Sequence, residues 1–265
     1  GSFDYYYRET NDLISRIPVP AGSNLTNEIY TNIGSLRNEG IEFSISSKPI
    51  VTNKFIWDLG FNIAYNSNKI TKLNKSNDTD YYIPVGGISG GTGNTVQAHK
   101  VGYPAFSYLL YEQVYDKDGN PIEGLYVDRN GDGVIDEADK RLYKSRDPKV
   151  VMSFTSRMEY KNFDFGFSLR ANLGNYVYDN VQSNNSSYSA IYNSAGYLNN
   201  LISRGTKFQN PQYMSDYYLH NAGFLRCDNI TLGYTWNELA QNKLKLRLYG
   251  AVQLSLIHIS EPTRP

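Results

Sequence analysis

The chain has one cysteine, few histidines and no excess of either charge. Each of these features excludes a class of protein or of site. Cys227 is the only cysteine among 265 residues, so there is no intrachain disulfide framework and no CxxC redox or zinc motif. The three histidines, His99, His220 and His258, are scattered and lack the spacing of metal motifs such as HExxH. Lysine plus arginine equals aspartate plus glutamate, at 26 each, so no basic surface is expected to attract nucleic acid.

Long apolar runs are also lacking, and this excludes a membrane-spanning helix, which needs about 18 or more apolar residues in a row. The first residues do not resemble a signal peptide and read as the middle of a strand, so we expect that the true beginning of the protein is not included. The chain is rich in aromatic residues, with 24 tyrosines and 11 phenylalanines, although its mean hydropathy is -0.51. This combination is typical of strands with one apolar face and one wet face.

A strict alternation of apolar and polar residues predicts long strands. Within residues 54–70, every second position from Phe55 to Tyr65 is apolar, and the positions between include Asp58 and Asn62. Such alternation over about eleven residues indicates an extended strand with one apolar face. Globular strands average about 5 to 6 residues, whereas a strand tilted across a bilayer needs roughly 9 to 11. The length therefore favours a membrane-spanning strand.

The same pattern recurs along the chain, and the polar faces carry charge. Residues 152–160 and 163–173 alternate in the same way around a tight turn at Lys161 and Asn162. A charged face cannot form the dry core of a sandwich, but it can line a water-filled lumen while the other face meets lipid. The residues expected to face the lumen are Arg157, Glu159, Asp164, Arg170 and Asn172. Further strands are expected around Phe3, Tyr5 and Tyr7; Ile41, Phe43 and Ile45; Leu225, Cys227, Leu232, Tyr234 and Trp236; and Leu244, Leu246, Leu248 and Val252.

Short and long connections alternate between these strands. Short turns are expected at 48–53, 161–162 and 237–242, and long polar excursions near 10–30, 73–148 and 175–221. Outer-membrane barrels have short periplasmic turns and long outer loops. The sequence therefore predicts an all-β fold, part of a large antiparallel transmembrane β-barrel, with 73–148 on the outer side. A strand pair inside that segment, for example around 107–115, would not change this assignment.

A secreted, soluble β-sandwich that binds calcium and carbohydrate is the alternative from another class of protein. Such a module can also have alternating strands and many tyrosines. It would be a soluble monomer in buffer, whereas a barrel segment would need detergent or lipid. An enzyme is not expected, because no nucleophile, base and orienting group stand out together.

The stretch DRNGDGVIDEAD, residues 128–139, matches the calcium loop of the EF-hand. That loop has oxygen ligands at positions 1, 3, 5, 7, 9 and 12 and a glycine at position 6. The ligands expected here are Asp128, Asn130, Asp132, the carbonyl of Val134, Asp136 and Asp139, with Gly133 in the turn.

Two features of this loop restrict its role. Position 12 is an aspartate, Asp139, where the EF-hand has glutamate, and the shorter side chain reaches less far toward an ion. The flanking segments GLYV and KRLY read as extended, so a calcium sensor with a moving helix pair is not expected. We expect a structural Ca²⁺ on an outer loop, and the alternative is a turn rich in Asp, Asn and Gly that binds no metal.

Tyrosines in the predicted outer loops are candidates for stacking on sugar rings. The candidate substrate-binding residues are Tyr81, Tyr82, Tyr108 and Tyr111. The alternative, which we favour, is that these rings pack within the loops or form an aromatic girdle. The glycine-rich segment 86–95 lacks the GK[ST] of a phosphate-binding loop and is expected to be a flexible loop.

Several stretches resemble the SusC/RagA-type TonB-linked outer-membrane transporters of Bacteroidetes-like bacteria. NIGSLRNEGIEF (32–43) is similar to the NxGxxxNxGxE strand signature of their barrels, and YVDRNGDGVIDEADK (126–140) is similar to their DxNGDGxIDxxD segment. Residues 147–179 resemble the hairpin that follows, and FLRCDNITLGYTW (224–236) resembles the strand near the end. The stretches occur in the family's order and cover most of residues 1–253.

The resemblance implies nutrient import across the bacterial outer membrane. Members of the family have a barrel of roughly 22 strands that is plugged by an N-terminal domain. A SusD-like lipoprotein covers the outer mouth, the TonB complex supplies energy, and the usual cargo is oligosaccharides, with peptides in some members. About eight candidate spanning strands occur here, so the chain is expected to be a C-terminal part of such a transporter, without the plug and unable to close the barrel alone.

The last residues depart from the family pattern. After Gln253 the family continues with an Asn-rich turn and a further strand, whereas this chain reads LSLIHISEPTRP (254–265). The stretch resembles a translated sequencing adapter, so we expect a non-native tail. The alternative is the end of a strand followed by a proline-capped tail.

Overall fold

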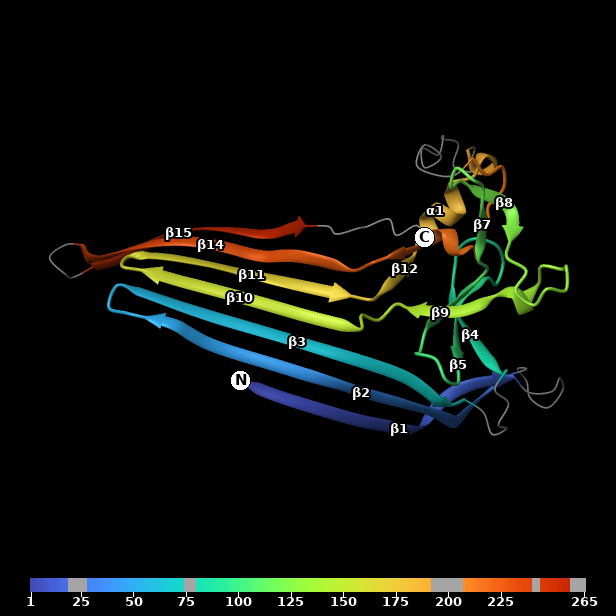
Figure 1. The fold of residues 1–265 in the computed structure, drawn as a ribbon, viewed down its shortest axis with the longest axis horizontal. Helices are drawn as coiled ribbons and strands as arrows, with labels where there is room; N and C mark the ends of the chain where they lie inside the picture. Colours follow the sequence, from blue (N-terminus) through green and yellow to red (C-terminus); the bar gives the residue numbers. More distant parts are fainter. Residues whose placement is uncertain (19–27, 74–79, 192–206, 240–243, 258–265) are drawn as a thin grey trace.

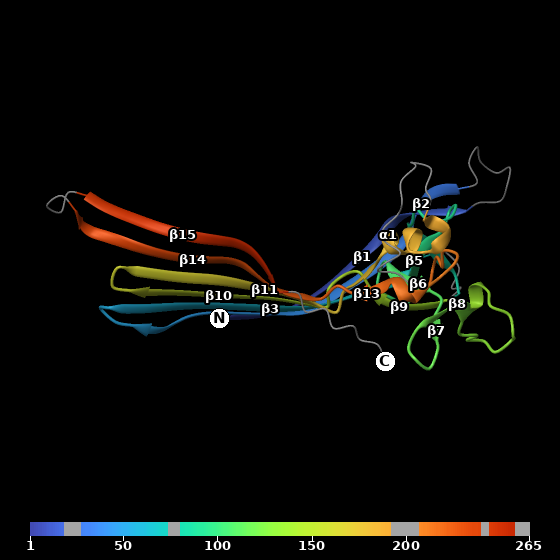
Figure 2. The same ribbon diagram turned by 90° about the horizontal axis from the view of Figure 1, so that it is seen from above.

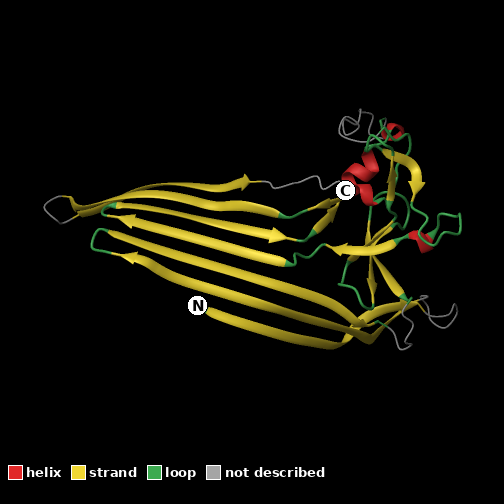
Figure 3. Ribbon diagram, in the orientation of Figure 1, coloured by secondary structure: helices red, strands yellow, loops and turns green. Residues whose placement is uncertain are grey.

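The computed structural model describes residues 1–18, 28–73, 80–191, 207–239 and 244–257. These residues form one long β-sheet and a smaller head at one end of it (Figure 1). The helices are short and lie in the head, as the colours of Figure 3 show. In the described part of the chain, no helix is long and apolar enough to span a membrane.

The sheet has seven strands in the order β1-β2-β3-β10-β11-β14-β15, and every neighbouring pair is antiparallel. The strands are β1 (Ser2–Pro18), β2 (Glu28–Val51), β3 (Phe55–Lys72), β10 (Val150–Tyr160), β11 (Phe163–Leu173), β14 (Phe224–Leu239) and β15 (Leu244–Ile257). The expected long antiparallel strands are confirmed. The described residues give seven of them, one fewer than the number estimated from the sequence.

The head is built from short strands and helical turns. One of its sheets has the order β4-β5-β6-β9, and two smaller ones pair β7 with β8 and β12 with β13. The elements are β4 (Tyr82–Gly87), β5 (Thr95–Lys100), β6 (Ser107–Leu110), β7 (Gln113–Tyr115), β8 (Pro121–Tyr126), η1 (Glu137–Asp139), β9 (Arg141–Ser145), β12 (Tyr176–Tyr178), α1 (Asn180–Asn185), η2 (Tyr188–Ala190), η4 (Asp216–Tyr218) and β13 (Leu219–Asn221). The extended segment expected at 107–115 thus divides into β6 and β7, and both strands lie in the head.

The register places the apolar residues of the long strands on one face of the sheet. Phe61 of β3 is opposite Phe154 of β10, and Phe154 is opposite Leu169 of β11. Many of these side chains are exposed, including Leu232 at 57% and Leu248 at 67%. Among the described residues no second sheet packs on this face, and Figure 2 shows a single layer. The face therefore suits an apolar environment and does not form the core of a two-sheet sandwich.

A β-bulge in β14 keeps the apolar residues of that strand on the same face. Ser168 of β11 pairs with Asn229, but the next residue, Leu169, pairs with Cys227, so Asp228 is the extra residue. An extra residue shifts the alternation by one position. The bulge therefore explains why the apolar positions of this strand change from odd to even numbers along the sequence.

The short turns lie at the end of the sheet opposite the head. Residues 52–54 join β2 to β3, and Lys161 and Asn162 join β10 to β11. Lys161 has a φ of 54°, which a two-residue hairpin turn requires. The turn expected at 161–162 is confirmed. The turn expected at 48–53 is present but lies at 52–54, because β2 continues to Val51 after a register shift between Ser47 and Ile50. The turn expected at 237–242 runs into 240–243, which lie outside the described residues.

The excursion expected near 10–30 is mostly strand. β1 continues to Pro18, β2 begins at Glu28, and these two residues are paired. The expectation was too wide because the register shifts near Leu13 and Asp12 has a positive φ of 58°, which interrupts the alternation. The excursions expected at 73–148 and 175–221 form the head, and their stretches 74–79 and 192–206 lie outside the described residues.

The head is attached to the polar face of β2 and β3. Asn38, in the NxGxxxNxGxE stretch, accepts a hydrogen bond from the side chain of Asn68 (2.6 Å), and Asn68 accepts one from the amide of Ala105 (2.9 Å). Ile70, which is 4% exposed, exchanges backbone hydrogen bonds with the turn 101–106. The turn therefore packs on the face of the seven-stranded sheet that is opposite the apolar face.

Candidate functional site

Two segments that are far apart in the sequence fold together to form the head. The first segment is residues 80–145, and the second is residues 175–191 and 207–221. Val96, Tyr108 and Leu110 of the first segment share a buried core with Tyr178 and Tyr218 of the second. Figure 1 shows the head at the end of the sheet away from the short turns. Short turns are periplasmic in outer-membrane barrels, so in such a barrel the head would stand at the outer end of the sheet.

Asp216 is the main polar connection between the two segments of the head. Its carboxylate accepts hydrogen bonds from the amide of Gln113 (2.9 Å) and the hydroxyl of Tyr143 (2.8 Å), and Arg141 Nη2 lies 3.4 Å away. The Asp216 amide donates to the carbonyl of Tyr111 (2.9 Å). The Asp216 side chain is only 13% exposed, so these bonds are largely shielded from water.

Ion pairs link this connection to the expected calcium loop at residues 128–139, called the DRNGDG loop below. Glu112 Oε2 lies 3.1 Å from Arg141 Nη1 and accepts a hydrogen bond from Arg129 Nη1 (2.8 Å). Burial and the adjacent Asp216 carboxylate raise the pKa of the Tyr143 hydroxyl, so it remains a donor at neutral pH. Asp216, the first segment and the loop are therefore joined as one structural unit.

The expected calcium ligands at the start of the loop form hydrogen bonds within it. Asp128 accepts the amides of Gly131 (2.7 Å) and Gly133 (2.8 Å), and the side chain of Asn130 donates to Asp132 (2.8 Å). In the described part of the chain, no three Asp, Glu, His or Cys side chains are grouped as metal ligands would be. In this conformation the loop does not present a calcium site, and calcium binding stays a prediction.

The later expected ligands differ in burial and in hydrogen-bond partners. Asp139 is fully buried and accepts the amides of Asp136 (2.9 Å) and Arg129 (2.7 Å), whereas Val134 is 59% exposed. Asp136 accepts the amide of Ala138 (2.8 Å) and caps the turn η1. The backbone hydrogen bonds, first that from Asp136, lower the pKa of Asp139. The stabilisation by this carboxylate is therefore complete above the ordinary aspartate pKa and is lost as the pH falls through the lowered value.

Calcium at this loop would have to compete with the backbone amides that Asp128 now accepts. We expect calorimetry on the refolded protein to show weak calcium binding, with a Kd of roughly 10⁻⁴ to 10⁻³ M. Asp128→Ala is expected to abolish it. Asp116→Ala is the control, because Asp116 also accepts backbone amides, from Asp118 (2.9 Å) and Asn120 (2.8 Å), outside the loop. The same calcium heat in wild type and Asp128→Ala would show that the loop is not the site.

Two of the four candidate substrate tyrosines are held by contacts inside the head. Tyr108 is 4% exposed, and its hydroxyl donates to the carbonyl of Tyr176 (3.1 Å), so packing is confirmed for this residue. The ring of Tyr111 stacks on Tyr126 with centroids 4.9 Å apart, and Lys140 Nζ lies 5.0 Å from the Tyr111 centroid. Burial, followed by nearby carboxylates, raises the pKa of Tyr111 to about 12.

The other two candidate tyrosines lie at the N-terminal end of β4. Tyr81 directly precedes β4 and Tyr82 is its first residue. Both are half-buried, and burial raises the pKa of both hydroxyls. The charge of Glu137 adds to this effect at Tyr82 and at Tyr111, so these two tyrosines lie near η1. Protonated hydroxyls can both donate to and accept from a sugar or a peptide. Substrate binding by Tyr81, Tyr82 and Tyr111 stays a prediction.

The residues expected to face the lumen lie on the polar face of the sheet. Asp164 accepts a hydrogen bond from Arg247 Nη2 of β15 (2.6 Å), and Arg157 Nη2 lies 3.0 Å from Glu159 Oε1. Asn172 follows Arg170 two residues later on the same face. Such exposed ion pairs contribute only about 0 to 1 kcal/mol each to stability. Their main consequence is a charged, hydrated surface along the wall.

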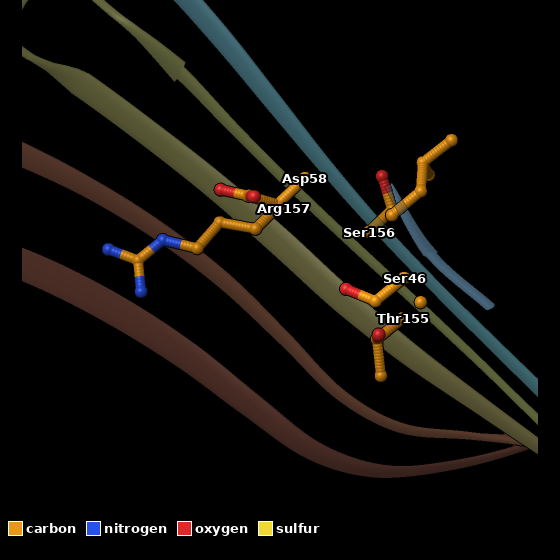
Figure 4. A pocket seen from close by; sticks show the side chains of 7 residues that line it. Ser46, Asp58, Thr155, Ser156 and Arg157 are labelled. Carbon is orange, nitrogen blue, oxygen red and sulfur yellow. The ribbon is translucent and has the colours of Figure 1, made fainter. Parts of the chain in front are cut away.

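A shallow pocket of about 170 Å³ lies on this face near the short turns. Ser46, Asp58, Gly60, Thr155 and Arg157 are among its lining residues (Figure 4). Gly60 creates the depression, because a Cβ there would lie 2.6 Å from the hydroxyl oxygen of Thr155. The pocket is open and carries one charge of each sign, so it is part of the hydrated wall and not an enclosed binding site.

Two arginines face each other on the polar face close to the head. Arg170 of β11 is the register partner of Arg226 of β14. The bulge residue Asp228 lies between them, with Oδ1 2.7 Å from Arg226 Nε and Oδ2 3.3 Å from Arg170 Nε. Sequence reasoning placed Arg170 correctly on the polar face but did not single out Arg226 or Asp228. The signal that could have found them is the odd-to-even change within FLRCDNITLGYTW, which indicates a bulge.

Comparisons with known proteins agree on a family. The family described as TonB dependent receptor-like, beta-barrel matches residues 1–132. The TonB-dependent receptor SusC of Bacteroides thetaiotaomicron is 50% identical over 263 residues, which cover 96% of this chain and 26% of that protein. A TonB-dependent receptor of Formosa agariphila is 28% identical over 288 residues, covering 98% of this chain and 28% of that protein. The chain therefore spans little more than a quarter of the length of these curated relatives.

Solved structures share the fold. The RagAB peptide transporter superposes with a TM-score of 0.70 at 21% identity, covering 95% of this chain and 29% of that chain. The RagAB peptide importer in its open-open state gives 0.69 at 20% identity, with 96% and 29% covered. TonB-dependent receptors are outer-membrane transporters and not enzymes, which agrees with the lack of a catalytic pattern in the sequence. The chain belongs to the TonB-dependent receptor family and is a portion of that family's outer-membrane β-barrel.

Proposed function

We propose that this chain forms part of the wall and outer head of a transporter that imports oligosaccharides, or peptides, across the bacterial outer membrane. The observation that carries the proposal is the one-sided sheet, which is apolar on one face and polar on the other over its seven strands. Such a sheet separates lipid from a hydrated passage. Transport by this wall depends on conformational change and involves no bond chemistry.

Two partners are part of this proposal. A SusD-like surface lipoprotein would cover the outer mouth, where the head stands, and the TonB complex would supply energy through parts of the protein outside this chain. The identity to SusC and the fold shared with RagAB support both partners. The head is suited to meet a lid because it is a folded unit with its own core and not a set of loose loops.

Oligosaccharides are the first cargo class proposed, and peptides are the second. Oligosaccharides are the usual cargo of the SusC/RagA-type transporters that this chain resembles, and SusC is 50% identical to it. The RagAB peptide transporter is only 21% identical, so its likeness supports the fold and leaves peptides as the second class. Tyr81, Tyr82 and Tyr111 are the candidate contacts, because half-buried rings at an outer mouth can stack on sugars.

Spin labels on neighbouring residues of β3 and of β11 test which face meets lipid. We expect labels at Phe61→Cys and Phe165→Cys, in full-length protein reconstituted in membranes, to collide with lipid-soluble oxygen. Labels at Asn62→Cys and Asp164→Cys are expected to collide with a water-soluble nickel complex. Cys227, which is 6% exposed, is replaced by alanine to avoid background labelling. The opposite pattern of collisions would contradict the proposed wall.

Uptake by cells that carry the full-length transporter tests the cargo class. We expect labelled oligosaccharides to enter in a manner that requires TonB. Labelled peptides of similar mass serve as the comparison. Entry of peptides alone would exchange the order of the two classes, and TonB-independent entry of both would contradict an energised transporter.

A further inference from the structure

We propose that Arg170 and Arg226 form a site on the lumen face of the wall that binds a carboxylate of the cargo. The inference rests on the proposed function, because it requires the polar face of the sheet to line the passage. Both side chains are partly exposed on that face, at 42% for Arg170 and 26% for Arg226. A bound carboxylate would therefore be reached from the passage and not from the lipid.

The first argument is the excess of positive charge at this point of the wall. Arg170 and Arg226 are direct cross-strand partners, and like charges in such a position destabilise a sheet. One carboxylate, that of Asp228, neutralises only one of the two guanidinium groups. On the same face, Arg157 and Arg247 each lie beside a carboxylate, that of Glu159 and Asp164 respectively. The arginine pair at the bulge therefore differs from the other ion pairs of the wall.

The second argument is which nitrogen atoms Asp228 engages. Asp228 Oδ1 accepts hydrogen bonds from Arg226 Nε (2.7 Å) and from Arg170 Nη2 (3.3 Å). Arg170 Nε lies 3.3 Å from Asp228 Oδ2, but it is buried and makes no hydrogen bond in the described part of the chain. Among the described residues, the terminal nitrogens of Arg226 make no hydrogen bond that would occupy them. The guanidinium of Arg226 is further held 5.3 Å from the ring centroid of Phe224. Two oriented guanidinium groups with terminal N–H groups available suit bidentate binding of a carboxylate.

The third argument is the setting of the pair. The Asn172 side-chain oxygen, two residues from Arg170, is buried and has no hydrogen-bond partner in the described part of the chain. Ser168, also two residues from Arg170, donates its hydroxyl to Asn229 (3.0 Å) on the far side of the bulge. Amide and hydroxyl side chains thus flank Arg170 along the polar face of β11. These groups match the hydroxyls of an acidic sugar or the amides of a peptide that carries the carboxylate.

The position of the pair favours cargo over an internal wall contact. Arg170 is three residues from the head end of β11, and Arg226 is two residues from the head end of β14. At about 3.3 Å per residue, the site lies within roughly 10 Å of the point where the strands enter the head. A solute that enters from the outer side would meet this pair directly below the head.

Two pairs of probes that differ only in a carboxylate test the site on the full-length transporter. One pair is a galacturonate oligomer and its methyl ester, and the other is a peptide with a free C-terminus and its C-terminal amide. We expect wild type to bind the acidic member of at least one pair about tenfold or more tightly by calorimetry. Arg170→Gln and Arg226→Gln should remove this preference, and Arg170→Lys should keep part of it. Arg247→Gln, on the same face, should keep all of it.

The outcomes separate the site from the function on which it rests. Equal binding of acidic and neutral probes by wild type overturns the site but leaves transport intact. Arg170→Gln could instead weaken binding of both probes equally and lower the melting temperature without any probe. That result would mean that the arginine pair stabilises the protein, and it overturns the site. Binding of no probe by wild type overturns the proposed cargo classes, and the site with them.

Discussion

Replacing Asp216 with alanine is expected to separate the two segments of the head from each other while the seven-stranded sheet stays folded. The change removes the acceptor for the Gln113 amide and the Tyr143 hydroxyl, and it leaves Arg141 with Glu112 as its remaining carboxylate partner. Donors that lose their partner in a shielded position cost about 1 to 3 kcal/mol each, and breaking a buried ion pair costs about 3 to 5 kcal/mol. Because Arg141 is 31% exposed, we expect a total near the lower range, about 2 to 4 kcal/mol.

Hydrogen exchange on the full-length transporter would measure this effect locally. Asp216→Ala should speed exchange at the amides of Gln113 and Asp216, which now donate across the two segments, and leave β10 and β11 protected. Asp216→Asn keeps one oxygen acceptor, so its exchange rates at these amides should lie between those of wild type and Asp216→Ala. Asp147→Ala removes an exposed carboxylate 3.7 Å from Arg146 and should change little. Unchanged exchange in Asp216→Ala would mean that the apolar core alone holds the head.

The wall of the barrel could be predicted from the sequence because its signal is local. Alternation from Phe55 to Tyr65 fixes which side chains share a face, whatever the strand pairs with. The turn at Lys161 and Asn162 then sets the register of the hairpin, and the structure pairs Tyr160 with Phe163 as this requires. The sequence misleads where the alternation of apolar and polar residues is interrupted. At Asp12, which has a positive φ, the interruption makes part of β1 resemble a loop.

The head could not be predicted in the same way, because its contacts are long-range. The partners of Asp216 lie 103, 75 and 73 residues away, and no local pattern connects them. The same holds for Tyr108 and Tyr111, which look alike in sequence. Tyr108 is enclosed because Tyr178 and Tyr218 arrive from the second segment, whereas Tyr111 stays half-buried. Which tyrosine is available to a cargo thus depends on how the two segments meet.

The DRNGDG loop shows a different limit. Aspartate and asparagine oxygens that ligate calcium are the same atoms that accept backbone amides in tight turns, and glycine serves both through positive φ. Asp128 accepts two such amides here, with Gly131 and Gly133 at φ of 74° and 82°. One residue pattern therefore encodes both an ion site and a self-closed turn. Both the ion site and the self-closed turn are compatible with the family resemblance of this stretch.

Phe61→Arg is expected to be among the most damaging single substitutions in the wall, because it places a charge on the face assigned to lipid. Phe61 lies near the middle of the apolar stretch of β3, opposite Phe154 and Ile45. A charged side chain at the midplane of an outer-membrane barrel costs about 2 to 4 kcal/mol, whereas the lumen face tolerates charge. Asn62→Arg is the matched control, since Asn62 is the next residue, is exposed and points to the opposite face.

The two variants should differ in the amount of folded protein that reaches the outer membrane, measured by heat-modifiable gel mobility of the full-length transporter. Phe61→Arg should lower this amount several-fold, and Asn62→Arg should leave it near the wild-type level, because its guanidinium stays in water beside Ser153, to which Asn62 now donates (3.1 Å). A larger loss from Asn62→Arg would mean that the polar face meets lipid. That result would reverse the assignment of the two faces and remove the basis for a charged passage, for the arginine pair at the bulge and for import through this wall.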